Sequence, residues 1–146
     1  MVFSSNQKAY IAGFLVGDGS IYVQMKPNSS YKFGFQISPY IVFFQSSKCR
    51  ENFEKVCNLV GLGYIRERKD EILEYIIGKR QDVLTLLEAI EPYVLLKKKQ
   101  VELMKLILTK KDEVKTESDF LVLAELVDNF RDLNYSKKRK RRTLTP

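Results

Sequence analysis

The chain has 146 residues, with 25 lysines and arginines against 18 aspartates and glutamates, a formal net charge of +7 and no histidine. This length corresponds to one ordinary domain, and 45% hydrophobic with 29% charged residues is typical of a folded globular protein. Without histidine, Ser-His-Asp and Cys-His catalysis are excluded, and two cysteines alone cannot form a structural zinc site. Any catalysis must therefore use carboxylates, lysines, water and, where a metal takes part, a hard ion.

Six consecutive basic residues, 137–142, carry most of the net charge. Such a run suits DNA, RNA, anionic lipid or a nuclear-import receptor, and it equally suits a tail that is merely solvated. We therefore expect a single domain over residues 1–135, followed by a basic and mobile C-terminal tail over residues 136–146.

The sequence shows no sign of export or membrane insertion. No apolar run approaches the roughly 18 residues that span a bilayer, and the N-terminus lacks a signal-peptide pattern. Cys49 and Cys57 fall on the apolar stripe of a predicted helix, so we expect both to be reduced and buried. These features predict an intracellular protein, in an organelle or a prokaryotic cytoplasm, that is not secreted and has no membrane partner.

The N-terminal half predicts a helix followed by a β-hairpin. Residues 6–17 are apolar and small, and period-two alternation follows over residues 21–26 and 31–43. A Pro-Asn-Ser-Ser turn separates the two runs, which gives a hairpin with one apolar face and one hydrogen-bonding face. Pro39 interrupts the second run, so we expect an edge position or a bulge there.

The remaining sequence repeats this order and then adds helices. It predicts, in turn, a helix capped by Ser47, a second hairpin over residues 64–77, a helix that stops at Pro92, a helix over residues 96–110, and a helix that begins with the capping-box-like pair Thr116 and Asp119. The predicted fold is therefore α+β, of the type αββαββα with further C-terminal helices.

The first predicted helix is chemically unusual. It contains Gly13 and Gly17, and each glycine costs about 0.5–1 kcal/mol relative to alanine in a helix. Small residues at this spacing let two helices approach closely, so we expect the helix to pack against its own copy. Asp18 would then stand at a helix C-terminus, where a negative charge is unfavourable and a hard cation such as Mg²⁺ would relieve the conflict.

A simpler interpretation of residues 17–20 is a helix end that runs into a β-turn, with Asp18 as a solvated turn residue. This alternative leaves the second glycine without a reason. It also does not account for the polar hairpin that follows immediately.

Residues 11–19, IAGFLVGDG, resemble the LAGLIDADG motif of homing endonucleases. Further segments are similar to the single-motif, homodimeric enzymes encoded in ribosomal-RNA introns of green-algal chloroplasts: the Lys-Pro-Asn turn and Ser-Tyr-Lys-Phe within 26–33, GLGYIRER at 61–68, and EPYVLLKKKQ at 91–100. These motifs occur in order at compatible spacing, and the resemblance covers residues 8–134. It implies the LAGLIDADG fold, with an antiparallel saddle-shaped sheet that binds DNA.

The resemblance also implies the catalytic residues. Asp18 is expected to bind the catalytic metal ion, together with the backbone carbonyl of Gly17. Gln45 corresponds to a residue that orders the attacking water, and Lys97 to a lysine that contacts the scissile region. Mg²⁺ is the expected cofactor, with Mn²⁺ as a substitute and Ca²⁺ supporting binding without cleavage.

Two positions depart from the family pattern. Val16 stands where the motif has its first aspartate, and we expect activity to survive because the second aspartate binds the metal. Cys49 stands where the family has a basic residue early in the second helix, and either Arg50 or Lys48 is expected to take over that role.

The polar sheet face is the predicted DNA contact. Arginine suits guanine, glutamine suits adenine and glutamate can accept a hydrogen bond from cytosine; the alternative is an ordinary solvated sheet face. The predicted DNA-binding residues are Tyr22, Gln24, Lys26, Asn28, Ser30, Lys32, Gln36, Ser38, Tyr40, Arg66, Arg68 and Glu74. The predicted dimer interface consists of Ala12, Gly13, Leu15 and Gly17.

The sequence therefore predicts an intron-encoded homing endonuclease that cleaves both strands of a long, roughly palindromic double-stranded DNA site by metal-dependent phosphodiester hydrolysis. One motif per chain requires a homodimer, since each strand needs an active site. The alternatives are an RNA maturase, with intron RNA as its partner, and a non-catalytic DNA-binding regulator of the same fold.

Overall fold

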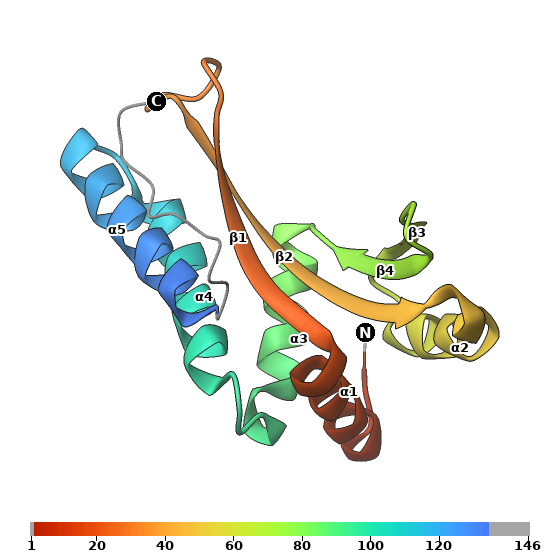
Figure 1. Cartoon of the computed structure of the whole chain (residues 1–146). Helices are drawn as coiled ribbons and strands as arrows, with labels where there is room; N and C mark the ends of the chain where they lie inside the picture. Colours follow the sequence, from red (N-terminus) through yellow and green to blue (C-terminus); the bar gives the residue numbers. More distant parts are fainter. Residues whose placement is uncertain (1, 135–146) are drawn as a thin grey trace.

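The computed structural model describes residues 2–134, in which a four-stranded antiparallel sheet is covered on one face by helices (Figure 1). The predicted basic tail over residues 136–146 lies outside the described residues. The elements are, in chain order, α1 (Ser5–Asp18), β1 (Gly19–Pro27), β2 (Phe35–Ser46), the 3₁₀ turn η1 (Ser47–Cys49), α2 (Arg50–Val60), β3 (Tyr64–Glu67), β4 (Ile72–Ile77), α3 (Arg80–Ile90), the 3₁₀ turn η2 (Glu91–Tyr93), α4 (Lys98–Glu113) and α5 (Glu117–Leu133).

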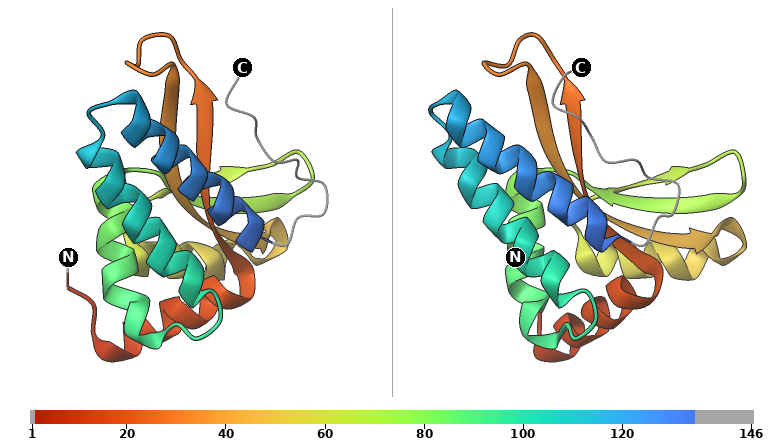
Figure 2. Two further views of the ribbon diagram at one scale, coloured as in Figure 1. Left: turned by 90° about the vertical axis from the view of Figure 1, so that its left-hand side faces the viewer. Right: turned by 60° about the vertical axis from the view of Figure 1, so that its left-hand side comes forward.

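The strand order is β1-β2-β4-β3, so the two hairpins meet where β2 pairs with β4. Period-two alternation places every second residue on the helix-covered face, where the core lies between the sheet and the helices. Phe43 of β2 and Leu73 of β4 are at most 2% exposed there, as are Leu86, Met104 and Val127 from the covering helices. The helices α4 and α5 run side by side next to β1, whereas α1 and α3 pack at the other end (Figure 2).

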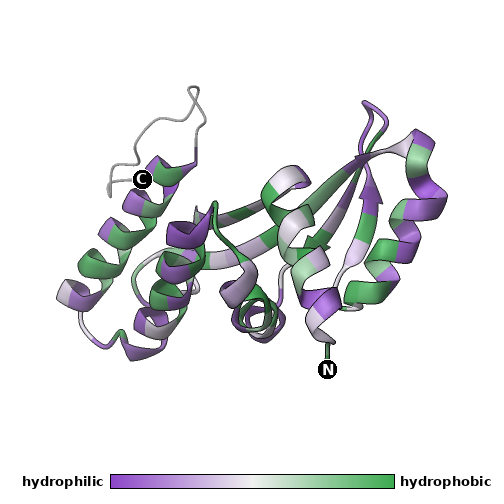
Figure 3. Cartoon of the chain, turned by 90° about the horizontal axis from the view of Figure 1, so that it is seen from below, coloured by the Kyte–Doolittle hydropathy of each residue, from purple (hydrophilic) through white to green (hydrophobic). Residues whose placement is uncertain are grey.

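Each covering helix buries one side and exposes the other. In Figure 3 the helices carry both hydrophobic and hydrophilic segments, as amphipathic surface helices do. The last helix begins as the sequence predicts, because Thr116 and Asp119 form a reciprocal capping box. Hydrogen bonds from the backbone N–H groups of Lys115 and Thr116 hold the pKa of Asp119 below its usual value.

The position of Pro39 follows from how far the central strand is paired. β4 pairs with β2 only from Ile41 onward, so the preceding half of β2 has β1 as its single neighbour. Proline has no N–H to donate, and it lies in this one-sided half, which confirms the predicted edge position. On the same half, the backbone C=O of Ile37 accepts a hydrogen bond from Lys111 Nζ at 2.7 Å, and burial lowers the pKa of Lys111.

The start of the second helix differs from the prediction. Ser46, not Ser47, accepts the capping hydrogen bond, from the backbone N–H of Lys48 at 3.2 Å, and a 3₁₀ turn precedes α2. Cys49 occupies the N-cap position of α2 and is exposed, so the prediction that it is buried is wrong; Cys57 is buried as expected, and both thiols are free. The cause is the extra 3₁₀ turn, which moves Cys49 out of the helical register of the apolar stripe.

Within residues 2–134, no helix combines the length and apolarity that a bilayer crossing requires.

The loop between α2 and β3 is fixed by one buried phenol. Tyr75 Oη accepts hydrogen bonds from the backbone N–H of Leu62 at 2.8 Å and of Gly63 at 2.7 Å, and burial raises the pKa of Tyr75. Gly63 is required by close packing, because a Cβ there would lie 2.3 Å from the carbonyl oxygen of Ile76. This contact fixes the second hairpin against α2.

Tyr75→Phe is expected to lower the free energy of unfolding by about 1–3 kcal/mol, because it leaves two backbone donors without a partner. Denaturant titration measures this loss. Tyr64→Phe is the matched control, since Tyr64 is 61% exposed and its substitution should have almost no effect. Equal losses in the two variants would contradict the proposed role of the Tyr75 hydroxyl.

Candidate functional site

One face of α1 is bare in the single chain. Gly13 and Gly17 are exposed, and a Cβ built on either would meet no atom within 4 Å. Tyr10, on the same face, is 55% exposed. The fold of one chain therefore gives no steric reason for glycine at these two positions.

Two residues of the predicted dimer interface lie elsewhere. Ala12 and Leu15 are 0% exposed and belong to the core of the chain, so their assignment to an intersubunit surface is wrong. The sequence alone could not distinguish the two sides of α1, because both are built from apolar or small residues. The bare face consists of Ala9, Tyr10, Gly13 and Gly17, and the four-residue spacing backward from Gly13 could have identified Ala9.

Asp18 and Gln45 come together at the end of this face. They line an open depression of about 470 Å³ whose remaining walls are Ala9, Tyr10, Gly13 and Phe14. Gln45 lies two residues after Phe43 on β2, so its side chain points to the same face of the sheet as the core residues. At that point the sheet passes α1, and the Gln45 side chain therefore reaches the depression. Its Oε1 accepts a hydrogen bond from the backbone N–H of Ser46 at 3.0 Å, which fixes one end of the amide.

The carboxylate of Asp18 is electrostatically uncompensated within residues 2–134. It occupies the last position of α1, whose final turn contains no basic residue, and no ion pair of the described residues includes it. The free carbonyls at a helix C-terminus add further negative potential. This is an environment in which a cation would be bound favourably.

The oxygen donors of the site suit a hard metal ion whose remaining ligands come from outside the single chain. No cluster of three acidic, cysteine or histidine residues exists among residues 2–134, so one chain offers the Asp18 carboxylate and nearby backbone carbonyls such as that of Gly17. Mg²⁺ is typically bound through one or two carboxylates with waters and substrate phosphates completing the shell. The arrangement fits that mode and does not form an all-protein cage.

Lys97 follows α3 and η2 along the chain, as the sequence predicts, and its contact with the scissile region stays a prediction. It does not line the Asp18–Gln45 depression, and it stands at the N-cap of α4 in a left-handed backbone conformation with φ of 67°. A non-glycine residue in this region of backbone space is uncommon and costs energy. The structure therefore brings Asp18 and Gln45 together and leaves Lys97 outside that group.

The sheet face opposite the helices carries paired polar side chains. Tyr22 lies opposite Tyr40 in the β1–β2 register, and the neighbouring pairs are Gln24 with Ser38 and Lys26 with Gln36. The two tyrosine rings stack with centroids 5.0 Å apart, and burial raises the pKa of Tyr22. These residues form a row of hydrogen-bonding groups along the first hairpin.

The charged residues of the second hairpin are paired with one another. Arg66 donates to Glu74 Oε1 from Nη2 at 2.7 Å and from Nε at 3.1 Å, and Arg68 Nη2 lies 2.6 Å from Asp70 Oδ2. Arg66 and Glu74 lie opposite each other in the β3–β4 register, so the strand pairing brings them together. The sequence predicts their shared face, but it does not predict that both arginines already hold a carboxylate.

The tip of the first hairpin has its own local order. Asn28 Oδ1 accepts hydrogen bonds from the backbone N–H of Ser30 at 3.0 Å and from its hydroxyl at 2.7 Å, so these two polar residues stabilise the turn. Lys32 Nζ donates to the backbone C=O of Lys115 at 3.0 Å. This contact directs the ammonium of the exposed Lys32 toward the α4–α5 connection, and its role in DNA binding stays a prediction.

The comparisons with known proteins agree with this architecture. The family model described as LAGLIDADG endonuclease matches residues 11–110, and the chain belongs to this family. It is similar to DNA endonuclease I-CreI of Chlamydomonas reinhardtii, with 37% identity over 132 residues that cover 90% of this chain and 80% of that protein. It is also similar to DNA endonuclease I-CvuI of Chlorella vulgaris, with 30% identity over 131 residues that cover 90% and 81%.

Solved structures confirm the predicted fold class. The homing endonuclease I-CvuI in complex with the I-CreI target, in the presence of Mg, matches with a TM-score of 0.84 and 29% identity over 92% of this chain and 86% of that chain. The archaeal intron-encoded homing endonuclease I-Vdi141I, complexed with DNA, matches in fold with a TM-score of 0.80 and 20% identity over 95% and 90%.

Gly13→Ala is expected to raise the free energy of unfolding of the monomeric chain by about 0.5–1 kcal/mol, because alanine is the better helix former and open space surrounds the position. Gly19→Ala is the matched control and should destabilise, since its Cβ would lie 2.8 Å from the carbonyl oxygen of Leu15. Denaturant titration at a protein concentration where sedimentation shows a monomer measures both changes. A loss of stability in Gly13→Ala would mean that the single chain itself needs this glycine.

Proposed function

We propose that the chain is a site-specific homing endonuclease that binds a long, roughly palindromic double-stranded DNA as a homodimer and hydrolyses one phosphodiester bond in each strand with Mg²⁺. Membership of the LAGLIDADG endonuclease family and similarity to two DNA endonucleases support nuclease activity. The observation that carries the proposal is the exposed Asp18 carboxylate beside Gln45, at the end of a glycine-lined helix face.

The proposed homodimer is supported by the apolar or small residues on the exposed side of α1. A helix with apolar or small residues on all sides is normally buried on all sides, yet the single chain buries only one. A second α1 packed on Gly13 and Gly17 would cover the bare face and bring two Asp18 carboxylates together. Leu95 and Leu96 add apolar surface nearby, since they are 89% and 71% exposed and follow η2, which packs against α1.

DNA binding is supported by the polar sheet face. Structures of I-CvuI hold that protein with the I-CreI target and, in the presence of Ca, with its own target. In the present chain the rows on β1 and β2 offer amide, hydroxyl and ammonium groups, which suit base edges and phosphates in a major groove. Two such faces related by a dimer axis would suit a palindromic site.

The proposed chemistry assigns one task to each residue. Asp18 holds the metal ion with the backbone C=O of Gly17, and Gln45 orients a water through the end of its amide that is not bonded to Ser46. A bound Mg²⁺ lowers the pKa of water and stabilises the leaving oxygen. Mn²⁺ should replace Mg²⁺, and Ca²⁺ should support binding without cleavage. Lys97 remains a proposed contact to the scissile region.

The alternatives are less well supported. An RNA maturase would need an RNA-binding surface, and no feature of residues 2–134 favours RNA over DNA. A non-catalytic regulator would have no use for Asp18 beside Gln45. The intron-encoded origin and the intracellular location in an organelle or a prokaryotic cytoplasm stay predictions from the sequence.

Asp18→Asn is expected to abolish cleavage, because it removes the metal ligand. DNA binding should stay equal or become slightly tighter, because the substitution also removes a negative charge that repels Asp18 of the second subunit. Cleavage in Mg²⁺ and binding in Ca²⁺ are measured on the same duplex, selected from a randomised library. Glu88→Gln removes an exposed carboxylate on α3 and should cleave like the parent. Cleavage by Asp18→Asn would exclude the proposed metal site.

Gly13→Leu is expected to prevent dimer formation, because a leucine side chain would hold the two α1 helices apart while having free space within each chain. Sedimentation equilibrium measures the assembly, and circular dichroism checks that the monomer remains folded. An intact dimer in this variant would contradict the α1–α1 interface.

A further inference from the structure

The depression around Asp18 and Gln45 contains no cation among its lining residues. Displacement at a phosphodiester spreads negative charge over the phosphate oxygens, and enzymes stabilise that charge with lysine, arginine or metal ions placed in advance. Two cationic side chains follow Gln45 closely along the chain, Lys48 and Arg50. Their surroundings in the structure are very different.

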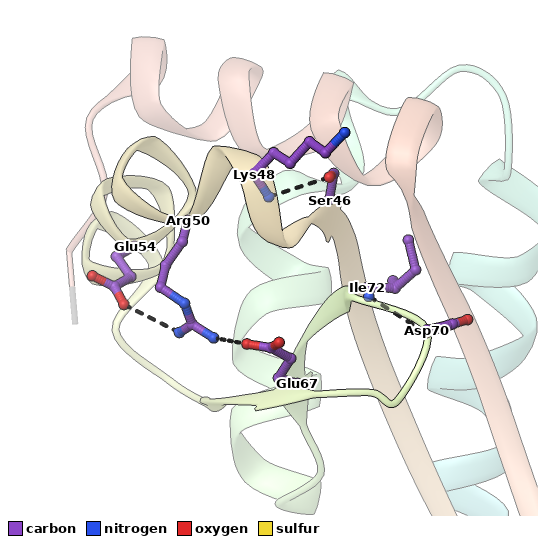
Figure 4. Close-up of polar contacts among 7 residues, drawn as sticks. All are labelled: Ser46, Lys48, Arg50, Glu54, Glu67, Asp70 and Ile72. Carbon is purple, nitrogen blue, oxygen red and sulfur yellow. Dashed lines mark hydrogen bonds and ion pairs between the residues drawn. The ribbon is translucent and has the colours of Figure 1, made fainter.

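Arg50 is already occupied by two carboxylates. Its guanidinium pairs with Glu67 of β3 through Nη2 and with Glu54 of α2 through Nη1 at 3.4 Å. The hydrogen bonds that Arg50 donates to Glu67, which has the larger effect, and to Glu54 raise the pKa of Arg50. Figure 4 shows the guanidinium between these two acids, where it bridges α2 and the second hairpin. Its positive charge is therefore locally compensated, and its position is fixed by a structural contact.

Lys48 has no such partner. The residue is exposed, and among residues 2–134 its ammonium group makes neither a hydrogen bond nor an ion pair, while its backbone N–H is bonded to Ser46 Oγ at 3.2 Å. In Figure 4 the Lys48 side chain extends away from the Arg50–Glu67 pair. The chain that carries it is ordered, since Ser46 bonds Lys48 on one side and the Gln45 side chain on the other.

These observations separate the two cations by function. We propose that Lys48 supplies the ammonium group that contacts the scissile phosphate beside the Asp18–Gln45 site, and that Arg50 holds α2 against β3. The proposal rests on the endonuclease function proposed above and adds a residue to it. A lysine ammonium is a mobile point charge on a flexible stem, which suits a phosphate whose charge changes during the reaction. Cys49, between them, is exposed and is not a basic residue, so it cannot supply a cation for that contact.

The test compares four variants in single-turnover cleavage with Mg²⁺ and in binding with Ca²⁺. Lys48→Met should lower the cleavage rate at saturating enzyme by about 100-fold, the scale of one lost transition-state contact, and Lys48→Arg should restore most of it. Arg50→Met should cleave at close to the parental rate while losing thermal stability. Lys55→Met is the matched control, because Lys55 is an exposed lysine of α2 whose removal changes the net charge equally.

A modified duplex identifies the phosphate. With an uncharged methylphosphonate at the mapped cleavage position, binding in Ca²⁺ should be weakened for the parent and for Lys55→Met, but not weakened further for Lys48→Met, since the two changes remove one interaction. Lys48→Met cleaving like the parent, or Arg50→Met losing the activity instead, would overturn the proposal. Failure of the parent to cleave any selected site in Mg²⁺ would instead contradict the endonuclease function itself.

Discussion

The first helix has one side buried in the core and one side bare, and this asymmetry fixes where the sheet and the Asp18–Gln45 site lie. Ile11, Ala12 and Leu15 are at most 1% exposed and belong to the core, whereas Gly13 and Gly17 lie on a face with nothing against it. The same helix leads directly into β1, so its direction also sets where the sheet begins. Its last residue, Asp18, is thereby placed where the bare helix face and the end of β2 meet. The fold, together with the proposed assembly and the proposed chemistry, therefore depends on one element of 14 residues.

The pleat of the sheet is the second constraint, because it sorts each strand residue to one of two faces. Residues of one parity form the core, and those of the other form the polar face proposed to meet DNA. Gln45 is the informative exception, since it has the parity of the core but extends beyond it. A polar side chain at that point reaches α1 and not the polar sheet face, which explains why an amide lies beside Asp18 while Gln24 and Gln36 lie on the opposite face.

The sequence predicts the architecture well because alternation, helical spacing and capping residues are local signals. The order of helices and hairpins, the edge position of Pro39 and the capping box at Thr116 and Asp119 are all confirmed. What the sequence does not reveal depends on three-dimensional packing. The side of α1 that is buried depends on the whole core, and the side on which Lys32 lies depends on a contact with residue 115, far away in the chain. A 3₁₀ turn shifts Cys49 to the surface, and no residue pattern signals that turn.

Whether an arginine is available to bind DNA depends on whether it already holds a carboxylate within the chain, and the number of arginines alone does not show this. Arg66, Arg68 and Arg50 each hold a carboxylate partner, so the sheet and the start of α2 contain fewer available cations than their sequence implies. If Arg66 leaves Glu74 to bind guanine, it exchanges one charge-assisted hydrogen-bonded pair for another. Binding is therefore favourable only at a DNA base whose hydrogen bonds replace those lost from Glu74. Exposed ion pairs are worth little, about 0–1 kcal/mol, so the exchange is feasible. Glu74, however, has only 13% of its side chain exposed and would be left partly buried without its partner. Discrimination between DNA sites can therefore arise from the cost of breaking the Arg66–Glu74 pair as much as from the contact that replaces it.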